Sequence, residues 1–129
     1  FHVSDPSDLS TAIYAPSITN ERLAGFGKYV IEAAKSKDRV AREILSEGGH
    51  ELGAAAVAVI CNLKLERERF QVAYVGGVFE AAGELVLSSM REEVSRVAPR
   101  AFLAPPRFSP AVAAARMARE RLNNLALAV

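Results

Sequence analysis

The sequence predicts an α/β fold in which helices pack around two short parallel strands. Most of the chain carries apolar residues at spacings of three and four, the period of an amphipathic helix. Residues 70–75 and 101–104 are rich in apolar and aromatic side chains and are separated by one such helix, so the two strands should be parallel with a right-handed crossover. The expected order is α-α-α-β-α-β-α. Because parallel sheets are normally larger and covered, we expect the remaining strands to be missing from this chain.

Three helices are predicted before the first strand. Residues 1–5 are expected to form a loose tail, followed by a short helix over residues 6–14. A second helix, over residues 19–34, should pack closely through Gly27. Its apolar face consists of Leu23, Gly27, Val30 and Ala34.

The third helix should be the longest. Asp38 is a favourable N-cap, and the apolar stripe continues to Leu63 or Lys64. The residues of this stripe are Ala41, Leu45, Gly48, Leu52, Ala56, Val59 and Leu63. Because only the first half has a charged outer face, we expect the second half to be buried. Gly48-Gly49 permits a kink or a break, since each glycine costs about 1 kcal/mol relative to alanine.

The C-terminal half alternates strands and helices. Residues 70–75 form a buried strand that stops at Gly76-Gly77, and residues 101–104 form the second strand. The helix between them covers residues 79–97, with Phe79, Ala82, Val86, Met90, Val94 and Val97 inward. Ser109 caps a last helix, and its small residues 111–115 indicate close packing. Residues 123–129 are expected to form a second loose tail.

Composition excludes several classes of function. The 129 residues are enough for about one domain, and 16 basic against 15 acidic side chains give a formal charge of +1, without the basic excess of a nucleic-acid binder. Cys61, the single cysteine, is expected to be buried and unreactive, and it excludes an internal disulfide. The longest apolar run, residues 52–61, is half of the roughly 20 residues that a bilayer requires. We expect a cytoplasmic protein with no membrane or nucleic-acid partner.

Two partial motifs carry no chemistry. Residues 25–28 resemble part of a phosphate-binding loop, but they lie in a helical pattern and no Ser or Thr follows. His50-Glu51 begins a zinc-protease signature, but Ala54 occupies the place of the second histidine. We therefore expect no metal ligands in this chain.

The glycine pair Gly76-Gly77 is the strongest candidate site. A strand that ends on two glycines before a helix brings bare backbone and a helix N-terminus to one point, where a nucleotide can bind. A tight turn with no ligand is the alternative explanation.

The surrounding pattern resembles a known family. It consists of Val75-Gly-Gly-Val-Phe79, a helix of about twenty residues, Pro99, a short strand, and the stretch from Pro106 to Ala115. This pattern is similar to the C-terminal end of the N-acetylglucosamine kinase family, whose wider group includes the ATPase activators of benzoyl-CoA reductase and 2-hydroxyacyl-CoA dehydratases. Residues 33–38 resemble the helix-turn-helix of that family. Ala113 departs from it, because the family has glycine there.

The resemblance implies part of a ribonuclease H-like, actin-like ATPase lobe, in which the Gly-Gly turn lies against the adenosine of ATP. It assigns adenosine contacts to Gly76 and Gly77, with Val78 and Phe79 as neighbours. The phosphate-binding hairpins, the Mg²⁺-linked acids and the catalytic aspartate of the family lie upstream. Residues 1–129 would then be one incomplete domain, the C-terminal portion of the second lobe. It would be inactive without its N-terminal lobe, and homodimer formation stays open.

Three functions follow from these observations. The first is ATP-dependent phosphorylation of an amino sugar, N-acetylglucosamine, by the intact protein. The second is an ATP-driven activator of a CoA-ester dehydratase or reductase; such activators hold an iron–sulfur cluster through cysteines, and a buried Cys61 argues against it. The third is a ligand-sensing domain that has kept the fold without catalysis.

Overall fold

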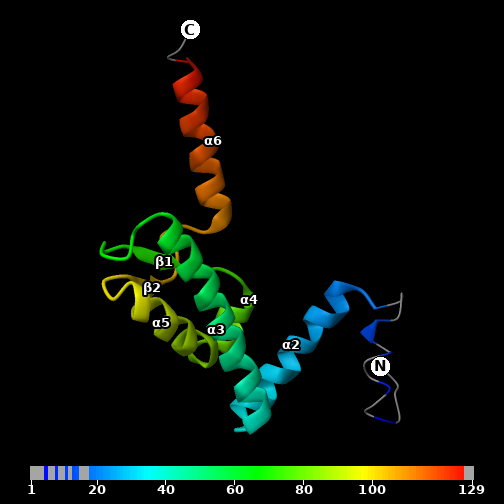
Figure 1. Ribbon diagram of the computed structural model, residues 1–129. Coiled ribbons are helices and arrows are strands. Elements are labelled where there is room, and N and C mark those ends of the chain that lie inside the picture. The colour runs from blue at the N-terminus through cyan, green and yellow to red at the C-terminus, as the bar shows by residue number, and fades with distance from the viewer. Residues whose placement is uncertain (1–4, 6–7, 9–10, 12, 15–17, 127–129) are drawn as a thin grey trace.

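The computed structural model describes residues 5, 8, 11, 13–14 and 18–126, so most of the predicted tail and first helix lies outside the described residues (Figure 1). The helices and strands are α2 (Asn20–Lys35), α3 (Arg39–Asn62), β1 (Gln71–Ala73), α4 (Gly77–Ala82), α5 (Glu84–Val97), β2 (Phe102–Ala104) and α6 (Pro110–Ala126).

The two strands form a parallel pair, as predicted. Gln71 pairs with Phe102 and Ala73 pairs with Ala104, and helices connect the strands. Each strand is three residues long, shorter than predicted. The predicted burial of β1 is wrong, because Gln71 and Ala73 are exposed while Val72 between them is half-buried. One face of the strand is therefore uncovered in the described part of the chain.

The body of the fold is the pair α3 and α5, which approach closely at two buried glycines of α3. A Cβ on Gly49 would lie 2.9 Å from the Cβ of Ser89, and a Cβ on Gly53 would lie 3.1 Å from the carbonyl oxygen of Met90. Helix α3 is continuous through Gly48-Gly49, so the break that these two glycines permit does not occur. The glycines instead let two backbones meet.

The buried stripe of α3 differs from the predicted one. It consists of Ala41, Leu45, Gly49, Gly53 and Ile60. The prediction that the second half of the helix is buried is wrong: Leu52 is 41% exposed, Val59 58% and Leu63 60%. Two apolar stripes lie side by side on this helix, and the one with glycines at the crossing permits the shorter distance between the helices.

The length and composition of α3 would suit a membrane-crossing helix, a property that core helices of soluble proteins share. Only 22% of its most apolar window is buried inside the fold. Much of its apolar surface is thus uncovered in the described residues, and the cellular location stays a prediction.

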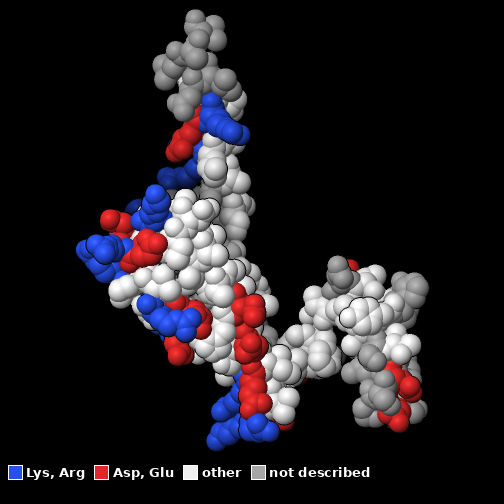
Figure 2. Space-filling model, viewed as in Figure 1, with Lys and Arg blue, Asp and Glu red and all other residues white. Residues whose placement is uncertain are grey.

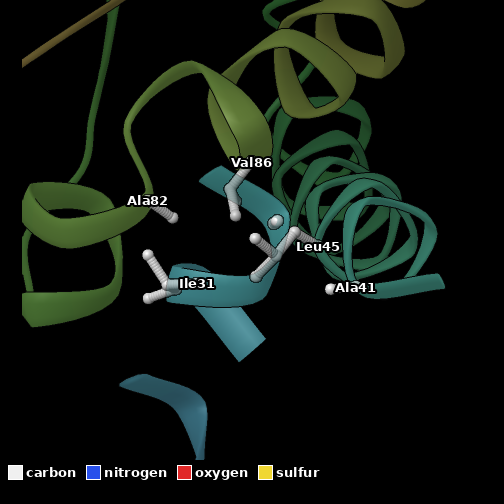
Figure 3. Packing of buried hydrophobic residues seen from close by; sticks show 6 residues of the cluster. Ile31, Ala41, Leu45, Ala82 and Val86 are labelled. Atoms are coloured by element: carbon white, nitrogen blue, oxygen red, sulfur yellow. The ribbon is translucent and has the colours of Figure 1, made fainter. Parts of the chain in front are cut away.

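Two clusters of buried residues position the candidate site. The first joins α2, α3, α4 and α5 through Ile31, Ala34, Ala41, Leu45, Ala82 and Val86 (Figure 3). Phe79 packs against this cluster. The second contains Ile60, Val94 and Ala98, and the strand residues Val72 and Leu103 pack against it. Because one cluster holds α4 and the other holds the sheet, the turn between β1 and α4 is fixed at both ends.

Helix α2 begins and ends one residue after the predicted bounds, and it packs differently. The hydroxyl of Thr19 caps it by accepting from the N–H of Arg22 at 3.3 Å. Its buried residues are Ile31 and Ala34 near the C-terminal end. The predicted close packing through Gly27 is wrong, since a Cβ there would meet no atom within 4 Å.

The predicted helix over residues 79–97 is in fact two helices. Gly83 separates α4 from α5, with φ 55° and ψ −127°. The inward positions Ala82, Val86, Met90 and Val94 are buried, as predicted. The apolar periodicity identifies the buried face of the segment correctly. It does not reveal the interruption at Gly83, because the spacing of the apolar residues continues across that glycine.

Helix α6 begins as predicted, with Pro110 first and the Ser109 hydroxyl accepting from the N–H of Val112 at 3.4 Å. It continues to Ala126, into the predicted tail, and leaves the body of the fold (Figure 1). The close packing predicted for residues 111–115 is wrong, because only Ala113 among them is half-buried and the others are exposed.

Candidate functional site

The glycine pair forms the predicted strand-to-helix turn. Gly76 has φ 128° and ψ 158°, a conformation that is essentially restricted to glycine. Its carbonyl oxygen accepts from the N–H groups of Phe79 at 3.1 Å and Glu80 at 3.3 Å, which starts α4. The backbone therefore requires glycine at position 76.

Position 77 has no such requirement. The φ of Gly77 is not positive, and a Cβ built on it meets no atom within 4 Å. Glycine is also a poor helix former. Neither the backbone conformation nor the packing of the described residues explains why Gly77 lacks a side chain.

The turn borders a pocket of about 390 Å³ that separates it from the loop between β2 and α6. This volume lies within the range of roughly 300–1,000 Å³ that small-molecule sites occupy. Its lining residues are Tyr74, Val75, Gly76, Phe79, Glu80, Pro105, Pro106, Phe108, Ser109 and Pro110. Of the four predicted contact residues, Gly76 and Phe79 line the pocket, whereas Gly77 and Val78 lie beside it.

Aromatic rings stand on both walls of this pocket. The ring centroids of Tyr74 and Phe79 are 5.2 Å apart and tilted by 44°. On the other wall, the guanidinium carbon of Arg116 lies 4.1 Å from the ring centroid of Phe108. Such faces can stack on a planar base, since every nucleobase has a π-face.

The polar groups at the pocket are few. Glu80 contributes a carboxylate and Ser109 a hydroxyl. The first-turn N–H groups of Gly77 and Val78 have no partner within the helix. These groups could bind ribose hydroxyls or the edge of a base. The favourable dipole expected from a long helix is smaller than predicted, because α4 has only 6 residues.

The second wall of the pocket was not assigned from the sequence. The Pro106–Ala115 stretch contributes to the family resemblance, but its position next to Gly76 depends on the pairing of β1 with β2. Parallel strands end at the same edge of a sheet, so the segments after the two strands meet there. The parallel order was predicted, and this consequence of it could have identified Phe108 and Ser109.

A larger hollow of about 580 Å³ lies at the C-terminal end of α4 and includes Lys35, Arg42, Ser46 and Ser88. The side chain of Arg42 donates to the carbonyl oxygen of Ala34 at 2.9 Å. This hollow contains no residue of the glycine turn and no aromatic ring. Its composition is less suited to a base than that of the pocket at the turn.

The other residues considered in the sequence take structural positions. His50 Nδ1 lies 3.0 Å from Glu93 Oε1 and joins α3 to α5. The prediction that Cys61 is buried is wrong, because its side chain is exposed. Among the residues that the structure describes, no group of three or more His, Cys, Asp or Glu side chains is placed to hold a metal ion.

The chain matches no protein-family model, no curated protein and no solved structure. The kinase-family resemblance therefore stays a prediction from the motif residues. The α/β class, with its pair of parallel strands among helices, is what the structure shows.

Proposed function

We propose that the Gly76-Gly77 turn binds the adenosine end of ATP, as part of the second lobe of an actin-like kinase that phosphorylates an amino sugar such as N-acetylglucosamine. The observation that supports this proposal most is Gly77. It is a glycine that the fold itself does not require, next to a pocket of ligand size. Close approach of a ligand to the backbone would account for the missing side chain.

The residues of the pocket suit this role. The base would lie between the Tyr74–Phe79 pair and Phe108, while Glu80 would accept hydrogen bonds from the ribose hydroxyls. Bound Mg²⁺ would neutralise charge on the phosphates during transfer, with ligands expected upstream of this chain. On this proposal the described residues bind and orient the nucleotide, and the groups for phosphoryl transfer belong to the N-terminal lobe.

Gly77→Val tests the proposal directly. A Cβ at position 77 meets no atom within 4 Å, so the fold should be retained, and the added side chain should interfere only with a ligand that approaches the backbone there. Gly76→Val is unsuitable because the φ of 128° strains any side chain. Gly25→Val in α2 is the matched control, since Gly25 is exposed and also has no neighbour within 4 Å.

We expect Gly77→Val to raise the Kd for MgATP by about tenfold or more in isothermal titration calorimetry of the intact protein, which corresponds to roughly 1.4 kcal/mol. The Gly25→Val protein should bind as the wild type does, and circular dichroism should show both variants folded. Unchanged ATP affinity in folded Gly77→Val would refute the adenosine assignment.

One observation favours keeping the activator function as a second candidate. The argument against it was the burial of Cys61, and Cys61 is exposed. An exposed thiol could share a cluster with a second subunit, as the resemblance implies for activators. Iron analysis with a visible spectrum separates the two functions: a bound cluster supports the activator, and ATP-dependent phosphorylation of N-acetylglucosamine in the absence of iron supports the kinase.

A further inference from the structure

Helix α3 carries an exposed apolar strip that no described part of the chain covers. We define the acceptor strip as Ile44, Gly48, Leu52, Ala55 and Val59, which recur at spacings of three and four on one side of the helix. Ile44 is 54% exposed and Val59 58%. Glu47 and Glu51 border the N-terminal half of the strip, and acidic side chains form a row along this part of α3 (Figure 2).

Helix α6 carries the complementary surface. We define the arm face as Ala111, Ala114, Ala118 and Leu122, all of which are exposed. Arg119 and Arg121 border its C-terminal half, and neither makes an ion pair within the described residues. Helix α6 also makes no extensive contact with any other described helix or strand. An amphipathic helix with an uncovered apolar face needs a partner.

The loop before α6 holds this helix away from the acceptor strip of its own chain. The side-chain amide of Gln71 donates to the carbonyl oxygens of Ala104 at 3.1 Å and Pro105 at 2.8 Å, which fixes the exit from β2. Prolines at 105 and 106 restrict φ at two positions of the loop, and Pro110 restricts φ at the first residue of α6. The contact of Arg116 with the Phe108 ring then ties α6 to the loop. The arm therefore extends from the body (Figure 1).

We propose that the arm face of α6 docks on the acceptor strip of a second copy of this chain, and that the second copy returns the contact. In Figure 1, α3 and α6 run in the same general direction, with α6 beyond the C-terminal end of α3. A two-fold axis perpendicular to α3 would reverse the α6 of the partner and bring it antiparallel to α3. A contact that each copy returns to the other in this way is isologous, as two-fold symmetry requires.

Charge fixes the antiparallel direction. In this arrangement the C-terminal half of α6, with Arg119 and Arg121, lies beside the N-terminal half of α3, with Glu47 and Glu51. A parallel arrangement would place the two arginines beside the C-terminal half of the strip, around Ala55 and Val59, where α3 has no acidic residue. At about 1.5 Å per residue, the 17 residues of α6 span roughly two-thirds of the 24 residues of α3. The proposal is independent of nucleotide binding.

Charge reversal on each surface gives a test. One variant carries Arg119→Glu and Arg121→Glu, and the other carries Glu47→Arg and Glu51→Arg. All four positions are exposed, so both variants should fold. The matched control reverses Glu68 and Glu92, two exposed acids outside both surfaces. Association is measured by sedimentation velocity over the micromolar range, with circular dichroism as a check on folding.

We expect the wild type and the control to form dimers. Each charge-reversed variant should associate about tenfold more weakly or worse, because several exposed ion pairs become repulsive. An equimolar mixture of the two variants should dimerise again, since each arm then meets an acceptor strip of opposite charge. A monomeric wild type, undiminished association of either variant, or a mixture that stays monomeric would overturn the proposal.

Discussion

The closest approach of α3 and α5 depends on Gly49, and the substitution Gly49→Ala measures that dependence. An added Cβ would lie 2.9 Å from the Cβ of Ser89 and closer still to the carbonyl oxygen of Val86. A backbone oxygen in a helix cannot rotate away. The two helices would therefore have to separate along their whole contact.

The expected size follows from two opposing terms. Overpacking of a well-packed interface costs roughly 1–3 kcal/mol. Alanine inside a helix is favoured over glycine by about 1 kcal/mol. The net expectation for Gly49→Ala is a free energy of unfolding up to about 2 kcal/mol lower than that of the wild type.

The neighbouring glycine is the control. Gly48 lies on the same helix, and a Cβ there meets no atom within 4 Å, so only the gain in helix propensity applies. Gly48→Ala should raise the free energy of unfolding by about 1 kcal/mol. Both values come from urea denaturation followed by far-UV circular dichroism, provided that the denaturant slopes agree. If both alanines stabilise the protein, the inferred close approach of α3 and α5 is wrong.

Two further outcomes are expected around α4 and α5. Gly83→Ala should lower the free energy of unfolding by about 1–3 kcal/mol, because alanine rarely adopts φ 55° with ψ −127°; Gly25→Ala, at an exposed helical position, should instead raise it in the same assay. The hydrogen bonds from Arg91 lower the pKa of the Glu84 carboxyl. Arg91→Met should therefore raise that pKa in an NMR titration, and an unchanged pKa would contradict the pairing of the two side chains. Since the folded-state pKa is lowered, the stabilisation is present above the ordinary carboxyl pKa and is lost as the pH falls through the lowered value; it should be small because both side chains are exposed.

Helix starts were predicted well because their signals are local. Asp38 caps α3, with its carboxylate accepting from the N–H of Ala41 at 2.8 Å, and Ser109-Pro110 starts α6. These signals depend on a few neighbouring residues. The parallel pairing of the strands was also predicted, because the connection through a helix leaves little alternative.

Burial was predicted less well because it depends on which other helices or strands pack against a residue. Cys61 and Leu63 lie in a strongly apolar sequence and are nevertheless exposed. Apolar periodicity shows that a face can be buried but not which element covers it. The candidate site divides in the same way: Gly76 was predicted from its own sequence, whereas Phe108 is brought next to it by the sheet.

The residues of α3 that were predicted to be buried but are exposed lie on one side of the helix. Gly48, Leu52 and Val59 were predicted inward and are exposed, and they lie in one line along the helix. All three belong to the one predicted stripe, which lies beside the stripe that the fold buries. A coherent apolar line beside the buried stripe indicates that α3 has two faces to cover, and the described chain covers one of them. The acidic border at Glu47 and Glu51 is complementary in charge to the arginines of α6, which is why the proposed contact pairs these two surfaces. The same periodicity that misidentified the core thus identifies the surface on which a second copy is proposed to dock.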